Sequence, residues 1–284
     1  MLTTFGVVSI TGVAGIAAQL NNFKGEDVFD RIVAKAGTGG WCALTIGDLM
    51  GKIAEELEGI PYVGDTLELT SDREICSVNL KGLDCVTFVE TTLAFARMLK
   101  KGGRTPADLV SEVSFIRYRG GVAGDFSTRL HYTSDWFVDN ENKHVLKLLS
   151  QLPGAESFTQ KVGFMTSHPD KYRQLVAHPE LIPKIKSLEI EINRRSIKFI
   201  PMDKIAAIEP LLKTGDIVGV CTNQRGLDIA HTGLVFRDQG IAHFMDASSM
   251  KSSMKVTIEH GPISRALNWS SNLTGAIFAR PLAP

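Results

Sequence analysis

The chain has 284 residues, 44% of them hydrophobic, so it can bury the core of one large domain or two small ones. Lys and Arg balance Asp and Glu at 31 each, and this zero net charge gives no indication of nucleic acid or an anionic membrane as a partner. The four cysteines lack CxxC pairs and zinc spacing, and no glycine-rich phosphate loop is present. We therefore expect no disulfide framework, no metal site and no cofactor.

The N-terminal segment is apolar at first and then polar. The run from Phe5 to Ala18 has the length of a signal-peptide core, and Gly15 and Ala17 fit the small residues before a cleavage point. No Lys or Arg precedes the run, so an N-terminal strand is the alternative. The run is too short and glycine-rich to span a bilayer. We predict that residues 1–24 form an export signal or N-terminal extension. The expected location is the periplasm, with the cytoplasm as the alternative and no stable membrane insertion.

Residues 25–284 are predicted to form a single domain that begins with helices. Helical periodicity covers residues 25–58, with a glycine-rich break inside it, and an extended segment follows. The strongest helical pattern runs from Asp84 to Lys101 and ends at two glycines. Apolar residues on two sides of this stretch predict a helix buried in the middle of the domain.

The middle of the chain contains a shorter helix and two less regular segments. Thr105 is the expected cap of a helix over residues 106–116. Arg129–Asn140 mixes aromatic and polar side chains, which is typical either of a half-buried loop or of a site that binds a polar ligand between aromatic walls. Residues 141–194 are polar and mostly helical, with two His-Pro breaks, and we interpret them as a helical insertion or lid on the core.

The C-terminal third has the pattern of a β-sheet. Alternating or continuous apolar runs predict strands at residues 197–201, 215–222, 229–237, 241–247 and 276–280. Helices followed by strands indicate an α+β domain, in which an antiparallel sheet packs against the central helix.

One cysteine stands at the expected start of the central helix. Asp84 suits the N-cap, which makes Cys85 the first helical residue, where free backbone N–H groups and the helix dipole favour a thiolate. The alternative is an inert buried thiol, because free cysteine often only fills space. Cys42, Cys76 and Cys221 have no reactive context, and we expect them to be structural.

A predicted hairpin supplies partners for this thiol. If Asp238-Gln239 form the loop, His231 lies directly opposite Asp246, at roughly 5 Å between the Cβ atoms. His243 then points to the other face of the sheet. Cys85, His231 and Asp246 would act as nucleophile, base and orienting group, and N–H groups at the helix start would stabilise an oxyanion.

Five segments of the chain form a recognisable set: Gly82–Glu90, Arg129–Trp136, Gly215-Asp216, His231–Gly233 and Asp246–Ser249. Together they resemble a known family, the bacterial N-acetylmuramoyl-L-alanine amidase-like proteins. That family lies in the NlpC-type branch of papain-like cysteine hydrolases of the cell wall, and the similarity extends from about residue 25 to the C-terminus. The resemblance implies a papain-like core and a triad of Cys85, His231 and Asp246, although relatives commonly have His at the Asp246 position.

The resemblance also implies a substrate. This is peptidoglycan or its muropeptides, cut through a thioester at the amide that joins the muramic lactoyl group to L-alanine. Asp84, Tyr132, Asp135 and Trp136 become candidate substrate contacts, and no protein partner is implied. Two alternatives remain open: a γ-D-glutamyl-diamino-acid endopeptidase that cuts further along the stem peptide, and a non-enzymatic wall-binding module.

Overall fold

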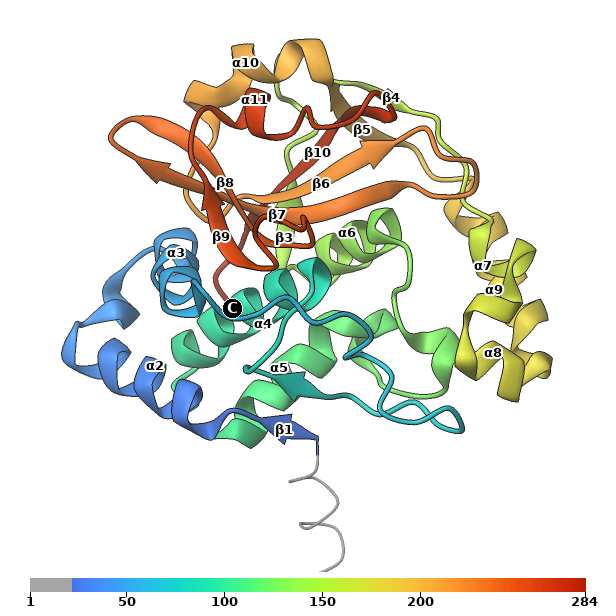
Figure 1. The fold of residues 1–284 in the computed structure, drawn as a ribbon, viewed down its shortest axis with the longest axis horizontal. Coiled ribbons are helices and arrows are strands. Elements are labelled where there is room, and N and C mark those ends of the chain that lie inside the picture. Colours follow the sequence, from blue (N-terminus) through green and yellow to red (C-terminus); the bar gives the residue numbers. More distant parts are fainter. Residues whose placement is uncertain (1–21) are drawn as a thin grey trace, which may run out of the picture.

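An antiparallel sheet packs against the buried helix α4 (Cys85–Lys100) in the computed structural model of the protein, which describes residues 22–284 (Figure 1). The sheet has eight strands in the order β4-β5-β10-β6-β7-β8-β9, and β3 pairs with β10. The predicted α+β class and the antiparallel pairing are confirmed. The predicted export signal or extension covers residues 1–24, of which residues 1–21 lie outside the described part. The last residues of that range form the short strand β1 (Phe23–Lys24), which pairs with β2 (Val78–Asn79).

The remaining elements follow the predicted order of helices before strands. The helices are α2 (Glu26–Thr38), α3 (Ile46–Leu57), α5 (Pro106–Arg117), α6 (Thr133–Asn142), α7 (Phe164–Ser167), α8 (Arg173–Ala177), α9 (Ile182–Ile192), α10 (Ile205–Ile208) and α11 (Ile263–Ala266). The strands are β3 (Leu146–Leu148), β4 (Glu156–Phe158), β5 (Ile197–Pro201), β6 (Ile217–Thr222), β7 (Ile229–Asp238), β8 (Ile241–Ser248), β9 (Lys255–Glu259) and β10 (Leu273–Pro281).

The two faces of the sheet are covered by different helices. Leu234 and Met245 belong to the main core, which includes the apolar side chains of α4. Val235 and Phe244 belong to a second core with residues of α10 and α11. Figure 1 accordingly shows α4 below the sheet and α10 and α11 above it, while α7, α8 and α9 are grouped at one side. The alternation of side chains along β7 and β8 therefore divides the sheet between two apolar layers.

Helix α4 is buried on nearly every side, as its sequence predicts. Thirteen of its sixteen residues are buried, and these include two charged residues. Glu90 accepts a 2.7 Å hydrogen bond from Arg117 of α5, and Arg97 donates a 3.1 Å bond to Glu112 of the same helix. Such pairing is necessary because an unpaired charge in the core would cost several kcal/mol, on the order of 3–5.

Two segments differ from the sequence-based expectations. Most of the aromatic and polar stretch at 129–140 is helical, since α6 begins at Thr133. The buried Asp228 stabilises this helix start by accepting a 2.7 Å hydrogen bond from the Ser134 backbone N–H. Residues 141–194 are not simply a helical insertion. They contribute β3 and β4 to the sheet before they form the group of α7, α8 and α9, whose own apolar cluster includes Met165 and Ile185.

Candidate active site

The helix start at Cys85 is fixed by a reciprocal cap. Asp84 Oδ1 accepts a 2.7 Å hydrogen bond from the Thr87 backbone N–H, and Thr87 Oγ1 accepts a 2.8 Å bond from the Asp84 backbone N–H. Cys85 is therefore the first helical residue, as predicted, and its side chain is half-buried. The Thr232 hydroxyl donates a 2.9 Å bond to the Cys85 carbonyl oxygen, which ties this end of α4 to β7.

His231 and Asp246 form the predicted pair across the hairpin. His231 Nε2 lies 2.6 Å from Asp246 Oδ2, and both side chains are largely buried. The hydrogen bond to Asp246 leaves the other ring nitrogen, Nδ1, for Cys85. The structure therefore brings the cysteine, histidine and aspartate together at the junction of α4, β7 and β8.

The predicted register of the hairpin is nevertheless wrong by two residues. Asp238 pairs with Ile241, so the loop is Gln239-Gly240, and both of these residues have positive φ, of 46° and 83°. A shift by two keeps each side chain on its face, because side chains alternate with a period of two. His231 and Asp246 are thus diagonal neighbours instead of directly opposed ones, and diagonal pairs are still within reach.

The surroundings of His231 make its imidazole unusually basic. Burial lowers the pKa of His231, but the hydrogen bond to Asp246 and the interaction with the Cys85 side chain outweigh it and raise the pKa to about 10. The ring is therefore protonated at neutral pH. A protonated imidazole beside a helix start favours the thiolate form of a neighbouring cysteine, which is the nucleophilic form.

This raised pKa gives a prediction for stability. The folded pKa of His231 lies above the value of about 6.5 for an unfolded histidine. The interactions of the protonated His231 ring therefore stabilise the folded state fully below about pH 6.5, and this contribution is lost as the pH rises through about 10. We expect the difference in free energy of unfolding between wild type and His231→Gln to shrink over this interval. Urea unfolding at about pH 6, 8 and 10 measures it. A constant difference would contradict the assigned ion pairing.

Tyr62 lies close to Cys85, and its sequence context does not predict this position. It forms a bridge with Leu83, and its backbone N–H donates a 2.9 Å bond to the Met254 carbonyl. Burial raises the pKa of its phenol, and the negative charges of Cys85 and Asp84 raise it further. The hydroxyl is therefore a neutral donor close to Cys85. A lone tyrosine after a proline has no sequence pattern that would have indicated this position.

A cavity of about 490 Å³ opens beside the imidazole. Its walls come from β7, β8, β9 and the segment around α11. Trp269 forms one wall, with its ring 5.8 Å from the His231 ring and nearly perpendicular to it, at 85°. The cavity is large enough for a small ligand. Residues that line it include His231, Phe244, Asp246, Glu259, Arg265 and Trp269.

Asp135, a predicted substrate contact, is committed to internal ion pairs. Its side chain is 2% exposed. One carboxylate oxygen accepts a 2.5 Å bond from Arg119, and the other pairs with Arg195. A carboxylate held by two guanidinium groups has little capacity left for substrate, and we assign it a structural role.

Tyr132 and Trp136 are also buried. The Tyr132 hydroxyl donates a 2.8 Å bond to Glu189 and accepts a 3.0 Å bond from the Met165 backbone, so it holds α7 and α9 against the core. Trp136 packs edge-on against Phe137 and lines a pocket of only about 30 Å³ behind the first turn of α4. Neither residue lines the cavity beside His231. Their placement favours structural roles over direct contact with substrate.

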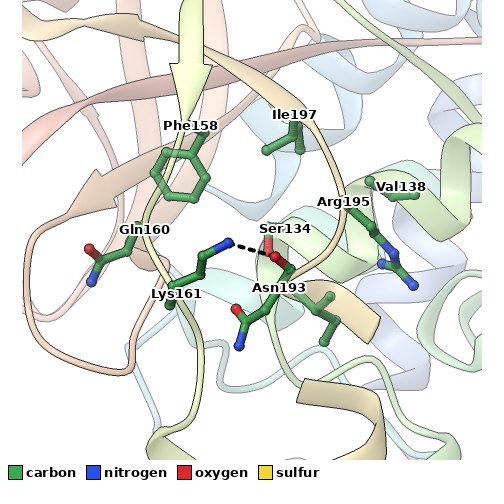
Figure 2. A pocket seen from close by; sticks show the side chains of 9 residues that line it. Ser134, Val138, Phe158, Gln160, Lys161, Asn193, Arg195 and Ile197 are labelled. Atoms are coloured by element: carbon green, nitrogen blue, oxygen red, sulfur yellow. Dashed lines mark hydrogen bonds between the residues drawn. The ribbon is translucent and has the colours of Figure 1, made fainter. Parts of the chain in front are cut away.

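A second small pocket lies between α6, β4 and the end of α9. Figure 2 shows Phe158, Gln160 and Ile197 around it, with the Lys161 ammonium donating to the Asn193 carbonyl oxygen at 2.6 Å. Its volume is about 20 Å³, which suits about one water molecule. It therefore cannot accept a sugar or peptide.

Residues 22–284 contain neither a cluster of metal ligands nor a helix suited to span a membrane. In this range, no three His, Cys, Asp or Glu side chains are placed together as ligands for a metal ion. None of the helices in the described part combines the length and apolar character that crossing a membrane requires.

Comparison with known proteins places the chain in a family. The profile of N-acetylmuramoyl-L-alanine amidase-like proteins matches residues 52–264, which is more than half of the chain. The chain belongs to this amidase-like family. The match includes Asp84, Cys85, His231 and Asp246. A search of curated proteins gives no match.

Several solved structures are similar to this chain. An N-acetylmuramoyl-L-alanine amidase from Bacteroides uniformis is 30% identical with a TM-score of 0.76, and the alignment covers 83% of this chain and 98% of that one. A Bacteroides fragilis protein named as a candidate xylanase is 29% identical with a TM-score of 0.72, covering 82% and 99%. A Legionella pneumophila protein at 19% identity and TM-score 0.68, covering 95% and 96%, shares the fold.

Proposed function

We propose that this protein is a cysteine amidohydrolase that cleaves the N-acetylmuramoyl-L-alanine amide of peptidoglycan or muropeptides. The observation that carries the proposal is the position of His231, which binds Asp246 at 2.6 Å and interacts with Cys85 at the start of α4. Membership of the amidase-like family supports the choice of bond. No cofactor is needed for this reaction.

The proposed reaction begins with acyl transfer to the cysteine. The Cys85 sulfur attacks the lactoyl carbonyl carbon and forms a C–S bond. Backbone N–H groups in the first turn of α4 donate to the oxyanion, and the neutral Tyr62 hydroxyl is placed to add a donor. The C–N bond then breaks, and the proton on His231 passes to the amine nitrogen. The stem peptide leaves with a free N-terminal amine.

Hydrolysis of the thioester returns the enzyme to its starting state. His231 takes a proton from water, and the water oxygen bonds to the thioester carbon. The C–S bond breaks, so the lactoyl group leaves as a carboxylic acid and Cys85 returns to the thiolate. Throughout both steps, Asp246 holds the imidazole in one orientation and stabilises its protonated form.

We also propose that the fold is papain-like and of the NlpC type. Two features support this. A buried helix carries the nucleophile at its first residue, and the antiparallel sheet packed on that helix carries the histidine and the aspartate on the neighbouring strands β7 and β8.

Glycoside hydrolysis, which the Bacteroides fragilis name suggests, has less support. Such enzymes use two free carboxyl groups on either side of the glycosidic bond. Asp246 and Glu259 both line the cavity, but Asp246 Oδ2 is bound to His231 and its Oδ1 is buried. The site is therefore better suited to a cysteine mechanism. A wall-binding module would not require the cysteine, histidine and aspartate to converge.

Digestion of defined muropeptides tests the proposed bond. We expect mass spectrometry to find free N-acetylmuramic acid and stem peptides that begin with L-alanine. An endopeptidase would instead leave L-alanine and the γ-D-glutamyl residue attached to the sugar, and a glycosidase would cut only the glycan. Either of these product patterns would overturn the proposed specificity.

The expected site of action is the periplasm. This part of the proposal depends on the apolar run within residues 1–24, together with the location of peptidoglycan in bacteria. Fractionation of cells that express the full chain tests it, and a purely cytoplasmic protein would contradict it.

A further inference from the structure

The cavity beside His231 extends well beyond the reacting groups. We propose that it binds the leaving stem peptide, and that Arg265 pairs with the α-carboxylate of the γ-linked D-glutamyl residue that follows L-alanine. This inference depends on the proposed amidase function, because that function defines which side of the scissile bond leaves.

The direction of the reaction assigns the two sides of the site. The acyl group becomes attached to Cys85, whereas the amine receives its proton from His231. The leaving chain must therefore extend past the imidazole. The cavity lies on that side, because His231 and Asp246 line it while Cys85 lies outside its walls. Its volume of about 490 Å³ is in the range that holds ligands of this size.

The charges in the cavity favour an anionic group near Arg265. Two carboxyl groups line the same cavity, but Asp246 is paired with His231. Burial raises the pKa of Glu259, and the charge of Asp246 raises it further. Within residues 22–284, Arg265 has no salt-bridge partner at 4.0 Å or less. A guanidinium can bind a carboxylate through two parallel hydrogen bonds.

Trp269 gives the cavity an apolar wall next to the imidazole of His231. The side chain is a large aromatic group at 44% exposure, and its ring stands edge-on to His231. It can pack against the methyl group of L-alanine while it shields the imidazole from solvent. The first residue of the stem would thus contact Trp269, and the second would reach Arg265.

Two substrates test whether Arg265 binds the D-Glu carboxylate or only supports the site in general. One is N-acetylmuramoyl-L-Ala-γ-D-Glu, and the other carries a carboxamide in place of the D-Glu α-carboxylate. We expect Arg265→Gln to lower kcat/KM by about 10-fold to 100-fold on the acid, as for loss of a charged hydrogen bond, and by less than about 3-fold on the amide. Arg265→Lys should recover part of the loss. Arg225→Gln, at an exposed arginine outside the cavity, is the matched control.

Calorimetry measures binding of the peptide L-Ala-γ-D-Glu to the Cys85→Ala variant, and this readout does not depend on turnover. Arg265→Gln in that background should weaken binding of the acid by about 10-fold or more and leave the amide analogue unchanged. Equal effects on both peptides, or none, would overturn the Arg265 assignment. Failure of the wild type to cut the muramoyl amide would overturn the proposed function instead, whatever the peptide binds.

Discussion

Cys85→Ala is expected to abolish cleavage of the muramoyl–L-alanine amide while the protein stays folded. Loss of a covalent nucleophile of this kind costs on the order of 10⁶-fold in kcat in a serine hydrolase, and we expect at least about 10⁴-fold here. The fold should tolerate alanine, which is a good helix former, because the Asp84–Thr87 cap is unaffected. Product formation from a defined muropeptide measures the loss, and circular dichroism with thermal unfolding checks the fold.

Selective alkylation provides the control for the identity of the nucleophile. Iodoacetamide near neutral pH should label Cys85 faster than the other three cysteines. Burial raises the pKa of both Cys76 and Cys221, so both thiols should react slowly. Cys42 is exposed, and its sulfur accepts a 3.4 Å hydrogen bond from Arg104, so it is the accessible thiol for comparison. Full activity in Cys85→Ala, or labelling of Cys85 no faster than of Cys42, would end the cysteine mechanism.

Local sequence signals account for the features that were predicted correctly. The start of α4 at Cys85 follows from Asp84 as a cap, and the end follows from Gly102, which has φ 85° in the structure. Both signals act within one helical turn. The pairing of His231 with Asp246 was also recovered, because an even shift of the hairpin leaves both side chains on the same face.

The features that were missed depend on contacts between distant parts of the chain. The helix α6 begins beside Asp228, which is 94 residues away from Ser134, and no local pattern indicates that contact. Trp269 and Tyr62 reach the site from opposite ends of the sequence. The burial of Asp135 likewise results from arginines 16 and 60 residues away, so a motif that resembles a family's cleft could not reveal its internal role.

His243 is the natural control for the third member of the proposed triad, because it lies on the same strand as Asp246. Its Nδ1 accepts a 3.1 Å bond from the Gly261 backbone N–H, and its ring packs near His260 at 5.8 Å. These contacts direct it away from His231. We therefore expect His243→Ala to keep kcat within about 3-fold of wild type, as for a residue that touches no reacting group.

Asp246→Asn should have a much larger effect than this control. The change keeps the size of the side chain, but the negative charge that stabilises the protonated imidazole is lost, and an amide that donates toward Nε2 would favour the wrong tautomer. Burial alone lowers the pKa of His231, so without this carboxylate the ring would lose much of its basicity. We expect kcat to fall by about 10-fold to 10⁴-fold with little change in KM, since the effect is on the reacting pair. Saturating-substrate kinetics of both variants decide the assignment. An active Asp246→Asn beside an inactive His243→Ala would show that a different residue orients His231.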